Sequence, residues 1–348
     1  TFSSRKLARK LHEDIAFRVL GAENFPAHRT LSEFRRRHLD DFESVFVQVV
    51  RIAREVGLVK LGTVAIDGSK VKANASKHKA MSYGRMQQEE KRLRKEIRSL
   101  MRQARQIDVQ EDRKYGADRT GDELPAELGR RRERLAKIQA AKARLEERQR
   151  EADRARGRSE DDDETKGPGG GRPFKRSFGE PAEKAQENFT DPDSRIMKAS
   201  GGFQQSYNTQ IAVDGDTRII VANGVTQSAA DSGQLRPMLD GVRRNTGRTP
   251  QRVLADAGYA SEENLRSLER RRIDGYVAQG RGEKPTQQTA SSPQRQTMHE
   301  KLKTKRGQQQ YRKRKHIAEP PFGWIKSVLG FRAFSVRGCA KVQAEWNL

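Results

Sequence analysis

Hydrophobic residues at the start of the chain recur every three or four positions, as on one face of an α-helix. We therefore predict helices throughout residues 1–60, with breaks at Gly21 and Gly57. The first apolar face comprises Leu7, Leu11, Ile15 and Val19. The last one, between Phe42 and Val56, comprises Phe42, Val45, Phe46, Val49 and Ile52.

The middle helix of this region is basic. Thr30 followed by Glu33 has the spacing of a capping box, which predicts that the helix begins at Thr30. Arg35, Arg36 and Arg37 follow directly. Three short helices with a basic middle one suit DNA docking, and an ordinary helical subdomain with a solvated basic face fits equally well.

A strand-like stretch follows, from Val64 to Val71. It contains Asp67 and Gly68, and two interpretations of this pair compete. Asp-Gly between two apolar runs is a strong hairpin signal, in which the acid only shapes a turn. Alternatively, a buried strand within 61–79 delivers the Asp67 carboxylate to a site.

Residues 80–157 predict an inserted hairpin of two long helices. Breaks at Tyr115-Gly116 and from Gly121 to Pro125 separate them. Apolar ladders run along both arms: Leu93, Ile97, Leu100, Ala104 and Ile107, then Leu128, Leu135, Ile138 and Leu145. The mixed charges on these helices favour a solvated surface without a binding role. The more specific alternative is that the hairpin mediates dimerisation or bridges DNA.

Residues 158–200 resemble a flexible linker. The acidic run from Glu160 to Glu164 consists of adjacent carboxylates that repel one another, so we do not expect it to bind a metal. The glycines from Gly167 to Gly171 lack the Lys-Ser/Thr of a phosphate-binding loop.

From Gly201 onward the pattern alternates between strands and helices. Asp214-Gly215 joins two matched strands, so there the hairpin interpretation is favoured. Another strand leads to Asp256, and Ser261 caps the following helix. Residues 201–348 thus predict a mixed α/β layer.

Composition indicates the partner. The 348 residues carry a formal net charge of +24, with a pI near 10.4, which implies a polyanion such as nucleic acid. Without a long apolar run or a signal-peptide pattern, we expect no membrane association and a cytoplasmic, nucleoid-associated protein. The single Cys339 excludes an internal disulfide framework and a cysteine-based zinc site. The missing initial methionine predicts an N-terminally truncated fragment.

Three acids stand out against this background. Asp67 and Asp256 follow similar apolar triplets, Val-Ala-Ile and Val-Leu-Ala. A buried carboxylate is costly unless it is paired or bound to a cation. Glu319 lies in a basic segment between Arg314 and Lys326, where it is either an ion-pair partner or a site residue.

These segments together carry a resemblance. The stretches Ile66 to Ser76, Ala255 to Tyr259 and Tyr311 to Lys326 are similar to the three acid-bearing motifs of DDE transposases of bacterial insertion sequences. The closest branch is the one with a long helical insertion between its first two acids. The resemblance covers nearly the whole chain and implies a ribonuclease H-like mixed sheet flanked by helices, with an N-terminal helical domain.

The resemblance also implies the site. Asp67, Asp256 and Glu319 would be the catalytic acids and would bind two Mg²⁺ ions, for which Mn²⁺ can substitute. Tyr311, Lys326 and a basic residue before Glu319 would contact DNA phosphates. Both Arg314 and Lys315 are candidates for that basic residue, and Pro320-Pro321 departs from a smooth helix.

The expected function is metal-dependent cleavage and strand transfer at insertion-sequence ends. A nuclease that does not join its products and a non-catalytic DNA-binding remnant are the alternatives. We expect double-stranded DNA as the partner, and a homodimer in the DNA complex.

Overall fold

The computed structural model describes residues 3–115, 126–163, 174–199, 201–280 and 292–348. They form two compact units. Unit 1 comprises residues 1–74 and 194–348, and unit 2 comprises residues 75–193. Among the described residues, no helix is long and apolar enough to cross a membrane.

Unit 1 is built on a mixed sheet in the order β4-β5-β1-β7-β8, with β6 also paired to β5. The strands are β1 (Thr63–Lys72), β4 (Arg195–Ala199), β5 (Gly202–Asp214), β6 (Ile220–Thr226), β7 (Arg252–Ala255) and β8 (Asp274–Val277). β1 is antiparallel to β5 and parallel to β7, which is parallel to β8. The predicted mixed sheet flanked by helices is confirmed at this level.

The hairpin interpretation of Asp67-Gly68 is wrong. Both residues lie in the middle of β1, opposite Ile211 and Gln210 of the 13-residue strand β5. Because β5 offers partners along the whole of β1, the chain continues straight through the Asp-Gly pair. Asp214-Gly215, in contrast, does join β5 to the antiparallel strand β6, as predicted.

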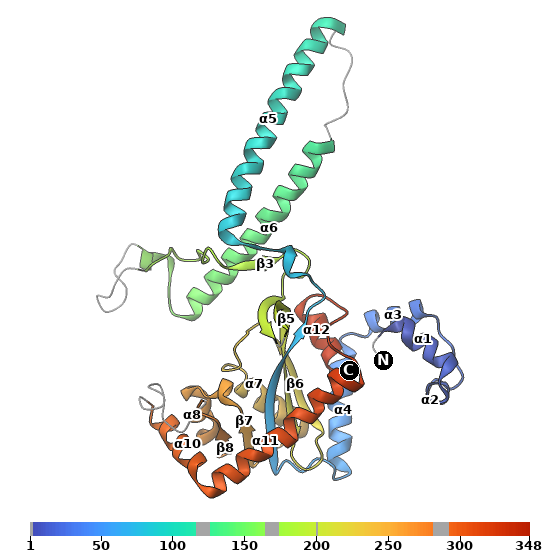
Figure 1. The fold of residues 1–348 in the computed structure, drawn as a ribbon, viewed down its shortest axis with the longest axis vertical. Coiled ribbons are helices and arrows are strands. Elements are labelled where there is room, and N and C mark those ends of the chain that lie inside the picture. Colours follow the sequence, from blue (N-terminus) through green and yellow to red (C-terminus); the bar gives the residue numbers. More distant parts are fainter. Residues whose placement is uncertain (1–2, 116–125, 164–173, 200, 281–291) are drawn as a thin grey trace. The chain divides into compact units, whose positions relative to one another are not determined.

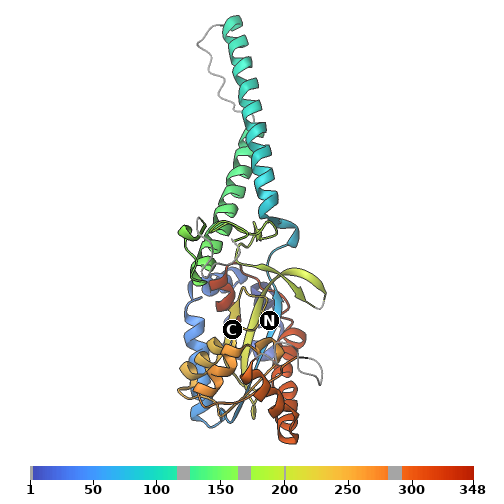
Figure 2. The ribbon, with the colours of Figure 1, turned by 90° about the vertical axis from the view of Figure 1, so that its left-hand side faces the viewer.

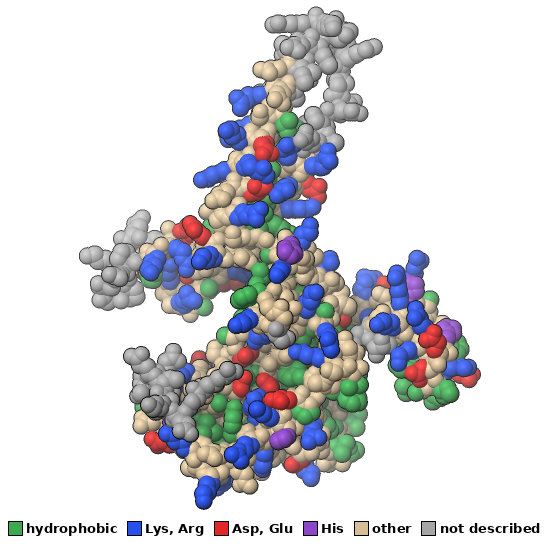
Figure 3. Space-filling model, in the orientation of Figure 1, with side chains coloured by type: hydrophobic (Ala, Val, Ile, Leu, Met, Phe, Trp, Pro, Cys, Tyr) green, Lys and Arg blue, Asp and Glu red, His purple; other side chains and the backbone are tan. Residues whose placement is uncertain are grey.

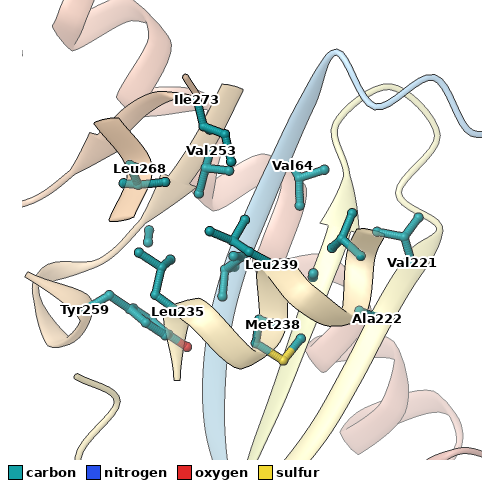
Figure 4. Packing of buried hydrophobic residues seen from close by; sticks show 14 of the residues in the cluster. Val64, Val221, Ala222, Leu235, Met238, Leu239, Val253, Tyr259, Leu268 and Ile273 are labelled. Atoms are coloured by element: carbon teal, nitrogen blue, oxygen red, sulfur yellow. The ribbon is translucent and has the colours of Figure 1, made fainter. Parts of the chain in front are cut away.

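The two faces of the sheet carry different helices. Side chains alternate between faces along a strand, so Val64 and Ile66 point one way and Asp67 and Ser69 the other. The first face packs on α7 (Leu235–Thr246) and α8 (Glu262–Arg270), and Figure 4 shows this core. Its buried side chains include Val64, Ile66, Leu235, Leu239, Val253 and Leu268. The second face meets α11 (Lys305–Gly323).

The C-terminal helices follow the last strand. α10 (Pro293–Lys303) precedes α11, whose end continues into a π-helical turn, Trp324–Val328, and α12 (Cys339–Trp346) closes the chain. Pro320 and Pro321 lie inside α11. A proline removes a backbone donor and crowds the preceding turn, which accounts for the irregular winding that follows.

The N-terminal helices differ in detail from their prediction. They are α1 (Ser4–Glu13), α2 (Ile15–Leu20), α3 (His28–Arg37) and α4 (Asp41–Glu55). The first helix breaks because the Asp14 side chain caps α2. Thr30 is not an N-cap, since α3 already begins at His28 after Ala27. Glu33 therefore bonds Arg36 and Arg37 instead of a helix end.

The predicted apolar face of α4 is wrong in part, because only Phe46, which packs against the core, and the half-buried Phe42 turn inward. Val45, Val49 and Ile52 are exposed, whereas Val50 and Ala53 are buried. The helix packs against α7 and α12 through a neighbouring stripe. Apolar spacing gives the helix but not the direction of its partner when the helix is apolar on more than one side.

Unit 2 contains two long antiparallel helices, α5 (Tyr83–Tyr115) and α6 (Ala126–Ala155), which lie side by side in Figures 1 and 2. Cross-helix pairs such as Arg131 Nε to Glu96 Oε2 (2.8 Å) hold them together. Leu93, Ile138 and Leu145 are buried between them, as the apolar ladders predicted. Lys and Arg side chains line the outer surface (Figure 3). The side chains of Ala104 and Ile107 and the break at 116–125 lie outside the described residues.

The segment predicted as a linker is partly ordered. It contains a 3₁₀ turn (Glu160–Asp163), β3 (Gln186–Asn188) and β4. β3 pairs with β2 (Ala80–Ser82), and β4 pairs with the first half of β5. β3 is polar and the apolar residues Ile196 and Met197 of β4 are adjacent, so neither strand has the apolar alternation that would have predicted it. The glycine run from 167 to 171 lies outside the described residues, and the remaining domain boundaries stay predictions.

Candidate active site

The register of the sheet aligns two of the predicted acids. Ile66 of β1 is directly opposite Ala255 of the parallel strand β7. Asp67, still within β1, and Asp256, the first residue after β7, come next along the two chains, so they lie at the same level of the sheet. β7 ends at Ala255, and Asp256 then caps a 3₁₀ turn, Ala257–Tyr259. β7 therefore pairs with β1 only as far as Ile66, and beside Asp67 the β7 side of β1 has no strand among the described residues.

Asp67 is largely buried, with 15% of its side chain exposed. Gly68 N donates to Oδ1 (2.9 Å), and Arg314 Nη1 donates to Oδ2 (3.1 Å). Burial raises the pKa of Asp67 to about 6. Arg314 and the Gly68 N–H act in the opposite direction, while the charges of Asp256 and Asp231 raise the pKa further. Desolvation of the carboxylate therefore outweighs the opposing charge of Arg314, and the two neighbouring acids add to it.

Three residues of α11 and the π-helical turn face this carboxylate. Arg314 contacts it directly, and the guanidinium lies 6.0 Å from the ring centre of Tyr311. Lys326 donates to Ser69 Oγ on the same face of β1. Burial lowers the pKa of Lys326, with Asp67 opposing that shift. The Lys315 side chain is exposed, so of the two candidate basic residues the structure brings Arg314 to Asp67.

Glu319 lies differently from the two aspartates. It is exposed on α11, one residue after the buried Ala318. Ala318 lies four residues after Arg314, which is the spacing of one helix face, and Glu319 is turned about 100° from it. Its assignment as the third acid stays a prediction.

The donor set fits a divalent ion in part. Asp67 and Asp256 offer carboxylate oxygens, the hard ligands that Mg²⁺ prefers. Among the described residues, however, no three His, Cys, Asp or Glu side chains lie close enough together to hold a metal ion. The structure thus assembles the pair without the predicted set of three.

Sequence reasoning missed one residue at this position, Asp231. It lies between β6 and α7, and its Oδ1 accepts from Asn208 Nδ2 (2.6 Å), Gln210 Nε2 (2.9 Å) and Lys70 Nζ (3.3 Å). Its charge is one cause of the raised pKa of Asp67. No spacing signal marks Asp231, because it stands alone in a loop of small residues.

The basic residues predicted on the middle N-terminal helix lie on α3. Arg36 and Arg37 both bond Glu33, at 2.6 Å and 2.9 Å for their closest atoms. These hydrogen bonds hold the pKa of the exposed Glu33 at about 2. Both guanidiniums remain at the surface, and binding a phosphate would compete with Glu33.

Comparison with known proteins decides the family. Residues 177–348 match the family model described as the transposase DDE domain. The chain belongs to the DDE transposases. The matched range includes Asp256 and the segment from Tyr311 to Lys326, and begins after Asp67. No curated protein matches the chain, and neither does any solved structure. The resemblance predicted from the three motifs is confirmed, and DNA is the partner that this family implies.

Proposed function

We propose that this DDE transposase cuts DNA at the ends of its mobile element and joins those ends to a target, in a reaction that depends on Mg²⁺. The observation that carries the proposal is the strand register that brings Asp67 of β1 and Asp256, directly after the parallel strand β7, to one level of the sheet, where Arg314 of α11 bonds Asp67. DDE transposases use divalent metals, and two Mg²⁺ ions, replaceable by Mn²⁺, are the proposed cofactors. When bound, such ions activate the attacking hydroxyl and stabilise the leaving oxygen.

Arg314 has a second part in this proposal. Its Nε is buried and has no hydrogen-bond partner among the described residues, while Nη1 is bonded to Asp67. A guanidinium offers donors in a planar fork that matches phosphate oxygens. Arg314 is therefore suited to hold a DNA phosphate beside the carboxylate pair, with Tyr311 packed on it.

Lys326 provides the other cation on this face. Its bond to the Ser69 hydroxyl places an ammonium two residues along β1 from Asp67. Because burial already disfavours the free charge, an incoming phosphate would stabilise it. Arg314 and Lys326 together position the scissile phosphate over the acids, and Lys315, at the exposed surface, contacts the backbone further out.

The finer assignments belong to the same proposal. We assign the sheet to the ribonuclease H-like fold, the chain to the branch with a helical insertion, and Glu319 to the third ligand position. Double-stranded DNA is the substrate, a homodimer acts in the DNA complex, and the protein acts in the cytoplasm at the nucleoid.

The test is an assay of cleavage and joining on DNA that carries the element ends. Strand nicking should require Mg²⁺ and should be lost in Asp256→Asn, while Asp214→Asn, at the far end of β5, should retain it. Nicking without any joined product would favour the nuclease alternative. No nicking by the parent chain, with intact DNA binding, would favour a non-catalytic remnant.

The N-terminal helices need a separate test. Charge reversal of Arg35, Arg36 and Arg37 should weaken DNA binding and lower its dependence on salt, because each lost phosphate contact reduces counterion release. The control with the same change in charge is the reversal of three exposed arginines on α5 of unit 2, Arg92, Arg94 and Arg98. Unchanged affinity would show that the basic face of α3 has no part in DNA binding.

A further inference from the structure

We infer that Asp231 is a positioning residue of the candidate active site, which fixes the turn carrying Asp256 against β1. The inference rests on the proposed function for its catalytic consequence. The contacts behind it come from the described residues of unit 1.

The first observation is the space that two glycines leave open. A Cβ at Gly68 would lie 2.9 Å from Asp231 Oδ1 and 2.4 Å from Gln210 Nε2. A Cβ at Gly258 would lie 3.2 Å from Asp231 Oδ2 and 3.0 Å from Asp256 Oδ1. The two oxygens of one carboxylate thus face the positions where side chains at Gly68 and Gly258 would begin, one residue after Asp67 and two after Asp256.

The second observation is the number of donors that hold this carboxylate. Asn208 and Gln210 project from β5 and Lys70 from β1, and all three donate to Oδ1. Asn208 and Gln210 are buried, and only 19% of the Asp231 side chain is exposed. A carboxylate with three donors on one oxygen is held in one orientation, which directs Oδ2 toward Gly258.

The third observation extends the network to the turn itself. The Tyr259 hydroxyl donates to Gln210 Oε1, and Gln210 donates in turn to Asp231. Asn264 Nδ2 bonds both Ser232 O (2.6 Å) and Tyr259 O (2.9 Å). The loop of Asp231 and the turn of Asp256 are therefore tied together on both sides.

The face of the sheet defines what Asp231 can do. Gly68 and Lys70 point away from the α11 face, on which Asp67 lies. Asp231 thus lies on the opposite face of β1 from Asp67. It supports Asp67 and Asp256 from that face and does not occupy a ligand position with them. Its effect on catalysis would pass through the orientation of Asp256, whose Oδ1 accepts from Gly258 N at 2.8 Å.

An ordinary buried polar network would have the same hydrogen bonds, so the test needs a matched control. Asp214 is fully buried and accepts from Lys60 N, Leu61 N and Thr217 Oγ1, at the opposite end of β5. Asp231→Ala and Asp214→Ala both remove a multiply bonded aspartate. Only the first should affect the site.

The experiment measures amide exchange and Mn²⁺ binding on the full chain. In Asp231→Ala, the amides of Gly258 and Tyr259 should exchange about tenfold faster than in the parent, as expected for the loss of a charged hydrogen-bonded group. Mn²⁺ affinity, measured by calorimetry, should fall about tenfold, which is typical of groups that orient metal ligands. Asp214→Ala should change neither value.

A second variant keeps the inference testable if Asp231→Ala does not fold. Asp231→Asn keeps an acceptor for Gln210 and should retain the slow exchange of the turn. Unchanged exchange in Asp231→Ala would overturn the inference, and so would faster exchange with unaltered Mn²⁺ affinity. If the parent itself binds no Mn²⁺ while the exchange still changes, the proposed function fails and Asp231 is left as a structural support, which also overturns the catalytic part.

Discussion

Asp67-Gly68 and Asp214-Gly215 are the same dipeptide on two paired strands, and their carboxylates have opposite surroundings. Asp214 accepts from the N–H groups of Lys60, Leu61, Asp216 and Thr217 and from the Thr217 hydroxyl, and within the described part of the chain no basic side chain bonds it. Asp67 has one N–H and one guanidinium, and acids lie nearby. A carboxylate that is saturated by backbone donors shapes the fold. A carboxylate that is buried with few hydrogen-bond donors is suited to bind a cation.

The comparison predicts its largest effect on cleavage. Asp67→Asn should reduce Mg²⁺-dependent nicking by about 100- to 1000-fold, because it removes one of the three proposed ligand carboxylates. Asp214→Asn should leave the rate per folded molecule within about twofold, since no reacting group depends on it. Equal losses in the two variants, after correction for the folded fraction, would abolish the distinction.

For the free energy of unfolding, we expect the larger loss in Asp214→Asn and not in Asp67→Asn. Asp214→Asn places an amide group against several N–H donors inside the protein, which should lower the free energy of unfolding by about 3 kcal/mol. Urea denaturation at pH 7.5 measures it. A loss below about 1 kcal/mol would mean that the bonds around Asp214 have little structural weight.

Asp67→Asn should instead stabilise the metal-free protein, and only at neutral pH. A carboxyl whose pKa rises from 3.8 to about 6 on folding contributes stability below pH 3.8, and this contribution is lost as the pH rises through about 6. At pH 7.5 the neutral amide should therefore add about 2 kcal/mol. At pH 4 the gain should vanish. A gain that is equal at both pH values would show that burial of the charge is not its cause.

Arg314 and Lys315 provide the smallest and most specific contrast. Arg314→Gln removes the cation nearest to Asp67 and should lower stability at pH 7.5 by about 1 kcal/mol, since the pair is partly buried. Lys315→Gln should stay within about 0.5 kcal/mol, as is usual for an exposed side chain. If Lys315→Gln had the larger effect, the assignment of Arg314 to the site would be wrong.

The sequence was informative where local chemistry determines the structure. The triplets before Asp67 and Asp256 predicted buried strands that lead to acids. β7 ends just before Asp256, whereas β1 continues past Asp67 to Lys72, and the parallel pairing places the two acids at one level. The apolar ladders predicted the two long helices of unit 2. In these cases spacing and residue type are sufficient.

The rest depends on contacts between distant segments. The choice between Arg314 and Lys315 depends on the rotation of α11 over the sheet, which residue counting near Pro320 cannot determine. Asp231 is held at the site by donors from β1 and β5, with Gly68 and Gly258 leaving room for its carboxylate. Thr30 was predicted as a cap from its spacing to Glu33, but Glu33 bonds arginines on its own helix.

The most direct test is anomalous diffraction from crystals of the full chain soaked in Mn²⁺. We expect a peak within coordination distance of both the Asp67 and Asp256 carboxylates, with Arg314 moved off Asp67 Oδ2. A Glu319 oxygen at the same peak would complete the predicted set of three acids. A fully occupied peak elsewhere, with Asp67 still bonded to Arg314, would contradict the claim that these two aspartates form the metal site.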